Sequence, residues 1–124
     1  MRFLILLSMV FMHIVDDYYL QGVLAKMKQR SWWEENAPQE EYKNDYKVAL
    51  FMHAFSWAFM IMLPYIFIGA SQYVVGGAII VNTIIHAIVD DLKANKKKIN
   101  LVADQSIHLA QILITWIVVG VLGF

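Results

Sequence analysis

Four histidines lie inside long apolar stretches of this chain, each close to one end of its stretch. An ionisable side chain within a bilayer is energetically unfavourable, so such residues usually mark a functional site. Neutral imidazole is also the commonest protein ligand of transition metals. The first candidates for chemistry are therefore His13, His53, His86 and His108.

Carboxylates accompany three of these histidines at a spacing of four residues. The pairs, in chain order, are His13/Asp17, His86/Asp90 and Asp104/His108. Helical residues four apart project from one face, so each pair can chelate a cation or form a ligand and its orienting partner. The reversed order of the third pair is what an antiparallel helix needs to present its carboxylate to the same membrane surface. Gln21, one turn beyond Asp17, continues the first stripe.

Four apolar segments must position these residues. Each has about 18 to 24 residues, which at a rise of 1.5 Å per residue matches a hydrocarbon core of about 30 Å. A hydrophobic content of 60% with 16% charged residues argues against a soluble domain of this size. We predict an all-α polytopic membrane protein, a single domain over residues 1–124 in which four transmembrane helices form an up-down bundle. The segments are Phe3 to Leu24, Lys47 to Ala70, Tyr73 to Leu92 and Ser106 to Phe124.

The first segment could be mistaken for a signal peptide, but its polar end continues into the histidine motif and no small-residue cleavage site follows. An interfacial connection at 26–46 then carries Trp32-Trp33, the usual amphiphile of a membrane interface. Pro38, followed by Gln39 and two glutamates, predicts a helix start. We expect a surface helix leading into the second segment, rather than a substrate lid.

Nine of the ten lysines and arginines flank the first and third connections, leaving only Arg2 on the other side. Cytoplasmic loops carry such an excess of cations. We therefore expect a multi-pass protein of the inner or cytoplasmic membrane, with both long connections in the cytoplasm and both termini extracytoplasmic. All four histidines then lie near the cytoplasmic face.

A metal site would explain this set of side chains. The chain has no cysteine, so the ligands must be nitrogen and oxygen, which suit one or two Zn²⁺, Mn²⁺ or Fe²⁺ ions. The expected ligands are His13, Asp17, His86, Asp90 and His108. His53 or Asp104 is a further ligand or the general base, and Lys93 either faces an anionic substrate or extends to the lipid headgroups.

The alternative is that these groups form hydrogen-bonded contacts between helices without any metal. Asp16 and Asp91 each lie one residue off the helical stripe, so we expect them to be solvated charges at the membrane boundary. A net charge of zero argues against a nucleic-acid partner. The chain also lacks a glycine-rich phosphate loop and a G-x-S-x-G motif, which disfavours P-loop and serine-hydrolase chemistry.

The motifs resemble those of the domain-of-unknown-function 3307 family, short membrane proteins of bacteria and their phages. They are His13-Ile-Val-Asp-Asp17-Tyr-Tyr-Leu-Gln21, His53, His86-Ala-Ile-Val-Asp90-Asp-Leu-Lys93 and Asp104-Gln105-Ser-Ile-His108. The resemblance covers nearly the whole chain, although the family commonly has Phe where this chain has Tyr18. It adds Gln21 and Gln105 to the polar site and carries no activity. A looser likeness links the family to predicted membrane-bound metal-dependent hydrolases.

The leading hypothesis is a metal-dependent hydrolase at the cytoplasmic face, acting on a phosphate-containing or lipid-linked small molecule. A second hypothesis is a protein that transports protons or divalent metals through the same cluster. A third is a small phage or accessory protein whose polar cluster is purely structural. The lipid bilayer is a partner in every case, and a homodimer is compatible with the sequence.

Overall fold

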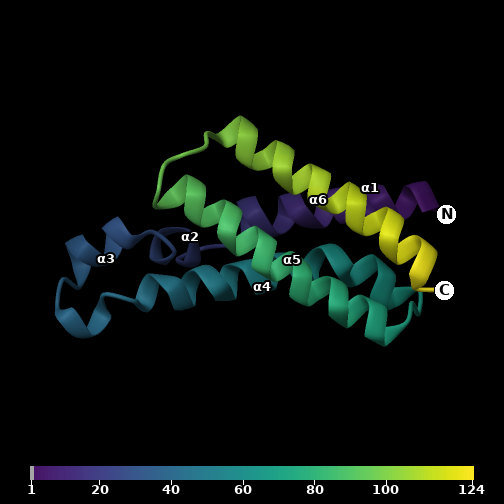
Figure 1. The fold of residues 1–124 in the computed structure, drawn as a ribbon, viewed down its shortest axis with the longest axis horizontal. Coiled ribbons are helices and arrows are strands. Elements are labelled where there is room, and N and C mark those ends of the chain that lie inside the picture. The colour runs from purple at the N-terminus through teal and green to yellow at the C-terminus, as the bar shows by residue number, and fades with distance from the viewer. Residues whose placement is uncertain (1) are drawn as a thin grey trace.

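The computed structural model describes residues 2–124, and these are mostly helical with no strand among them. Two short helices and two irregular helical turns interrupt four long helices (Figure 1). In chain order the elements are α1 (Arg2–Ile14), the π-helix η1 (Val15–Leu20), α2 (Leu24–Met27), α3 (Arg30–Asn36), the 3-10 turn η2 (Glu40–Tyr42), α4 (Asp45–Phe67), α5 (Gln72–Ala94) and α6 (Leu101–Leu122).

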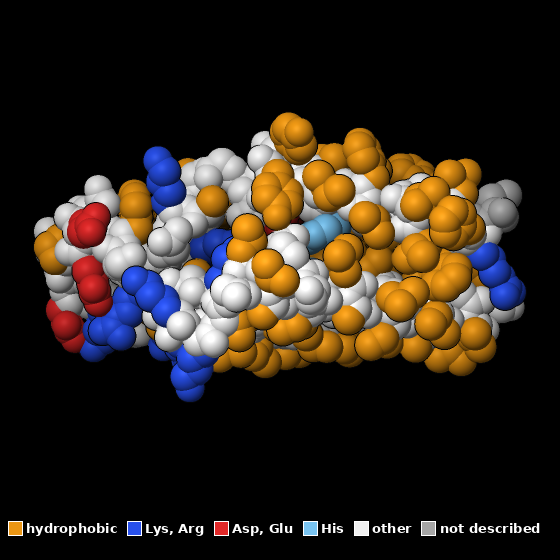
Figure 2. Space-filling model, turned by 90° about the horizontal axis from the view of Figure 1, so that it is seen from above, with side chains coloured by type: hydrophobic (Ala, Val, Ile, Leu, Met, Phe, Trp, Pro, Cys, Tyr) orange, Lys and Arg blue, Asp and Glu red, His pale blue; other side chains and the backbone are white. Residues whose placement is uncertain are grey.

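Four helical stretches are long and apolar enough to cross a membrane. They are Arg2–Leu20, Glu40–Phe67, Gln72–Ala94 and Leu101–Leu122. The predicted all-α class with four candidate transmembrane helices is therefore confirmed. The chain termini lie together at one end of the bundle, and both long connections lie at the other, here named the connection end (Figure 1). Figure 2 shows most charged side chains of one face gathered at the connection end, with hydrophobic side chains along the remaining length.

The centre of the bundle is packed by large side chains with no exposed surface. Met9 of α1, Trp57 and Ile61 of α4, and Ile112 of α6 are all 0% exposed. Helix α4 packs against α1 and α5, and α6 packs against α5 and α1. The outward faces carry exposed hydrophobic residues such as Phe11 and Ile114, which is compatible with helices long and apolar enough to cross a membrane.

The first helix departs from the regular α-helix that the sequence predicts. It continues beyond Ile14 as a π-helix, and Gly22 with φ of +50° then redirects the chain. The wider turn places two consecutive aspartates in the bundle, Asp16 being only 2% exposed and Asp17 a member of the polar cluster. The prediction that Asp16 is a solvated boundary charge is wrong, because its carboxylate accepts a hydrogen bond from the Ser56 hydroxyl at 2.7 Å.

The long connection folds back onto the bundle. Where the sequence predicts a surface helix after Pro38, the structure has only the 3-10 turn η2 before α4 begins. The tryptophan pair lies on the separate helix α3. Asn95 at the end of α5 holds this segment. Its side chain accepts a hydrogen bond from the Arg30 backbone N–H at 2.7 Å and donates to the Lys28 carbonyl at 3.1 Å.

Candidate metal centre

Each of the four long helices contributes one histidine to a single cluster. His13 comes from α1, His53 from α4, His86 from α5 and His108 from α6, and none is more than 2% exposed. The ring centroids of His86 and His108 are 4.1 Å apart, those of His53 and His86 5.0 Å, and those of His13 and His108 6.1 Å. The four imidazoles therefore share one depth in the bundle, at the connection end of its apolar core.

Asp90 lies between three of these imidazoles. Its Oδ2 atom is 2.9 Å from Nε2 of His53 and 3.7 Å from Nε2 of His86, whereas its Oδ1 atom is 3.2 Å from Nε2 of His108. The two oxygens thus face different sides of the cluster. A carboxylate placed in this way is able to bridge two positions.

Nε2 of His53 has more polar neighbours than one ring nitrogen can satisfy. Nε2 of His86 is 3.0 Å away, Oδ2 of Asp90 2.9 Å and Nε2 of Gln21 3.1 Å, and Oδ1 of Asp17 is 3.7 Å away. An imidazole nitrogen offers either one proton or one lone pair. A cation among these groups would satisfy several lone pairs at once.

Two sets of side chains offer ligand atoms that all lie within 4.8 Å of one another. The first is Asp17, His53 and His86, and the second is His86, Asp90 and His108. Two ligands of a tetrahedral ion, with bonds of about 2.1 Å, are about 3.4 Å apart. The distances of 2.9 to 3.7 Å around Asp90 match this spacing. The residues present therefore fit a divalent ion held by nitrogen and oxygen.

Asp104 borders the second set. Its Oδ1 atom is 3.1 Å from Nε2 of His108, yet within the described residues it is buried without a hydrogen-bond partner. Its Oδ2 atom accepts hydrogen bonds from Gln105 at 3.0 Å and from Lys93 at 3.3 Å. Two side chains thus hold Oδ2 of Asp104, whereas Oδ1 faces His108 and accepts no hydrogen bond from the described residues.

His13 belongs to neither set, and protein groups engage both of its nitrogens. The Trp57 indole N–H can only donate, and it lies 2.7 Å from Nδ1 of His13. The proton of His13 is therefore on Nε2, which donates to Oε1 of Gln105 at 3.0 Å. Gln105 in turn donates to Asp104. The structure thus gives His13 a place in a chain of hydrogen bonds that orients Asp104.

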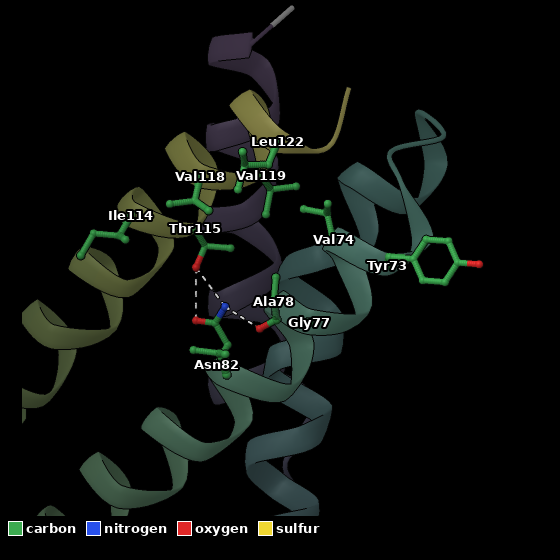
Figure 3. Close-up of a pocket in the computed structure, with 11 residues that line it drawn as sticks. Tyr73, Val74, Gly77, Ala78, Asn82, Ile114, Thr115, Val118, Val119 and Leu122 are labelled. Atoms are coloured by element: carbon green, nitrogen blue, oxygen red, sulfur yellow. Dashed lines mark hydrogen bonds between the residues drawn. The ribbon is translucent and has the colours of Figure 1, made fainter.

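A second chain of hydrogen bonds leaves His108 toward the opposite end of the bundle. Nδ1 of His108 is 3.5 Å from Oε1 of Gln111, and Gln111 donates to Oδ1 of Asn82 at 2.9 Å. Asn82 and Thr115 point toward each other across a groove of about 350 Å³ between α5 and α6, joined by the dashed lines of Figure 3. Beyond Thr115 the groove is lined by apolar residues such as Val74 and Val119.

A small polar cavity of about 70 Å³ lies on the other side, at the connection end. Asp17, Asp90 and Asp104 of the cluster line it together with two lysines, Lys28 and Lys93. Nζ of Lys28 is 2.7 Å from Oδ2 of Asp90. The cluster is therefore bordered on this side by a cavity that carries both carboxylates and ammonium groups.

All ten residues that the sequence singles out have at least one contact within this cluster, with Gln21 contacting Asp17 and Lys93 contacting Asp104. Lys28, Trp57 and Gln111 also contact the cluster, although the sequence motifs do not include them. Trp57 and Gln111 lie four and three residues after a histidine, a helical spacing that would have indicated them. No local pattern indicates Lys28, since only the path of the connection brings it to Asp90.

The comparisons with known proteins give a family without an assigned activity. No curated protein matches the chain, and no solved structure matches it. The family described as "Protein of unknown function (DUF3307)" matches residues 5–123, which include every side chain of the cluster. The chain belongs to the DUF3307 family.

Proposed function

We propose that this protein is a metal-dependent membrane hydrolase whose site opens toward the cytoplasm. The observation that supports this most is the environment of Nε2 of His53, which has the His86 imidazole at 3.0 Å and the Asp90 carboxylate at 2.9 Å. Excess cations at the connection end support a cytoplasmic orientation. The polar cavity at that end gives water and substrate access to the cluster.

The ligands divide into two groups. His53, His86, His108 and Asp90 form the centre, and Asp17 lies beside His53 and His86. When bound, a metal ion supplies a polarised substrate oxygen and a water molecule with a lowered pKa. His13 and Gln105 are positioning residues that hold Asp104, although the sequence suggests His13 as a ligand.

Asp104 is the proposed general base. It lines the cavity, and its Oδ1 atom is buried without a donor among the described residues. Its Oδ2 atom is fixed by Gln105 and Lys93, so the free oxygen has a defined direction. A carboxylate held in this way is suited to accept a proton from an attacking water.

The proposed substrate is a phosphate-containing or lipid-linked small molecule. Lys93 at the cavity is partly exposed and able to contact an anion. The site also lies at the end of apolar helices, where a lipid head group would reach it.

Elemental analysis of the purified protein tests the metal centre, with two neighbouring aspartates as a matched pair. Asp90→Asn should abolish bound Zn, Mn or Fe, because Asp90 contacts His53 and His108. Asp91→Asn should keep it, because Asp91 instead contacts Asn95 and Lys96. Metal-loaded protein should release phosphate from a phosphate monoester or a lipid phosphate. Asp90→Asn should abolish this release, and Asp91→Asn should keep it. Protein without stoichiometric metal, or equal effects of both variants, would refute the proposal.

Transport of protons or divalent metals is a second candidate, favoured by one observation. The Gln111, Asn82 and Thr115 chain carries polar groups from His108 into the middle of the bundle. Ser8, nearer the other end, bonds only to its own helix at Leu4. Ion flux into vesicles containing the reconstituted protein, abolished by Asn82→Leu, would favour transport over hydrolysis.

A further inference from the structure

Lys28 reaches the cluster from outside the four long helices. It lies at the end of α2, in the connection, and its side chain is only 14% exposed. Its Nζ atom is 2.7 Å from Oδ2 of Asp90, the same oxygen that lies 2.9 Å from His53. The ammonium group thus contacts a carboxylate oxygen that a divalent ion bound between Asp90 and His53 would also use.

Lys93 borders the same cavity from the end of α5. Its Nζ atom is 3.3 Å from Oδ2 of Asp104, and its side chain is 36% exposed. Two ammonium groups therefore line a cavity whose other charged groups are Asp17, Asp90 and Asp104. Lys28 is thus paired with the proposed metal ligand Asp90, and Lys93 with the proposed general base Asp104.

The charges of the cavity depend on whether a cation is bound. With neutral imidazoles, three carboxylates and two ammonium groups leave one net negative charge, which repels an anion. One divalent ion converts this to one net positive charge. An ion bound to Asp90 would also repel the Lys28 ammonium and release its three N–H donors toward the cavity.

We propose that Lys28 and Lys93 form a phosphate-binding subsite that becomes competent when a divalent cation binds at Asp90. This inference rests on the proposed metal centre and assigns the anionic part of its substrate. Lys28 occupies Asp90 before the metal binds and contacts the phosphate group afterwards. Metal and phosphate then bind in order, and each strengthens the binding of the other.

Calorimetric titration of the full-length protein in detergent tests this order, using Mn²⁺ or Zn²⁺ and then inorganic phosphate. In the unsubstituted protein, phosphate should bind only after the metal. Lys28→Met should tighten metal binding several-fold, since no ammonium competes for Asp90. It should weaken phosphate binding to the metal-loaded protein about ten- to a hundredfold, as expected for losing one charge-assisted hydrogen bond.

Two further variants separate these effects from damage to the fold. Lys28→Arg keeps the positive charge and should bind phosphate within a few-fold of the original affinity. Lys98→Met removes an exposed lysine of the neighbouring connection and should change neither titration. Thermal unfolding of every variant in the same detergent shows whether the bundle is intact.

The outcomes distinguish the inference from the proposed function. Absence of metal binding by the unsubstituted protein refutes both. Metal binding with phosphate affinity that is independent of metal, or unchanged in Lys28→Met, refutes the phosphate subsite and leaves the metal centre standing. Loss of metal and phosphate together in an intact Lys28→Met protein also refutes the subsite, because Lys28 would then support the metal site.

The phosphate could belong to a soluble molecule or to a lipid head group. Nanodiscs of phosphatidylcholine with or without phosphatidic acid distinguish these sources. If lipid phosphate occupies the subsite, phosphatidic acid should weaken the binding of inorganic phosphate to the metal-loaded protein, and this competition should disappear in Lys28→Met. Equal phosphate affinity in both discs would assign the subsite to a soluble phosphate compound.

Discussion

At the scale of single residues, the four histidines have similar burial but different hydrogen-bond partners. The two nitrogens of His13 face an indole N–H and a glutamine carbonyl, so its lone pair and its proton are both used. Nε2 of His108 instead faces Oδ1 of Asp90 and Oδ1 of Asp104. One ring nitrogen carries at most one proton, so it cannot give each carboxylate its own hydrogen bond, whereas a cation could contact both. We therefore expect different consequences of replacing each histidine.

Replacing His108 with alanine should remove most of the bound metal, whereas His13→Ala should weaken metal binding about ten- to a hundredfold, the range for residues that orient ligands. Metal affinity measured by competition with a chelator checks this difference. Gln105→Ala should resemble His13→Ala, because both interrupt the chain of hydrogen bonds that leads to Asp104. Equal losses from His13 and His108 would instead make His13 a direct ligand.

At the scale of elements, the π-helix and the long connection bring residues to the site that a regular helix could not. The wider turn after Ile14 accommodates Asp16 and Asp17 together, one bonded to Ser56 and the other to Gln21. The connection then folds back so that Lys28 lies at Asp90. Asn95 joins this segment to α5 through three hydrogen bonds, to Lys28, Arg30 and Asp91.

Removing the Asn95 side chain should therefore loosen the connection. Asn95→Ala should be cleaved faster by trypsin after Lys28 and Arg30, because the backbone at these residues loses its partners. Electrophoresis of timed digests in detergent measures the effect. Asn36→Ala is the control, since Asn36 donates only to Trp32 within α3 and should leave the cleavage rate unchanged.

At the scale of the whole molecule, the up-down arrangement gathers one histidine from each helix at one depth. Both termini lie at the end of the bundle opposite the connections (Figure 1). On the face shown in Figure 2, hydrophobic side chains lie along the length between the two ends, and charged groups gather at the connection end. The cluster therefore lies where a polar end meets an apolar span, with the small polar cavity on one side of it.

The orientation in the membrane can be tested with reporters. A reporter fused after Phe124 should be extracytoplasmic, while tags inserted within Lys26 to Asp45 or Lys96 to Asn100 should be cytoplasmic, because nine of ten cations flank these connections. Alkaline phosphatase and green fluorescent protein fusions report the two sides. A cytoplasmic C-terminus would reverse the proposed opening of the site.

The sequence alone determined the class of the fold and the identity of most site residues. Apolar segments of membrane-spanning length favour four helices, because a helix satisfies its backbone hydrogen bonds within each segment. The four-residue spacing of His86 and Asp90 places both side chains on one face, so their proximity follows from helix geometry alone.

Only the tertiary structure decided how these residues divide their roles. Whether His13 faces an ion or the Trp57 indole depends on how α1 rotates against α4, and helical periodicity does not fix that rotation. The burial of Asp16 depends on a local change of helical pitch, and the contact of Lys28 with Asp90 joins residues 62 positions apart. Such contacts arise from packing between elements. The intrinsic helix propensity of a segment is the same whichever neighbour its side chains face, so it does not decide these contacts.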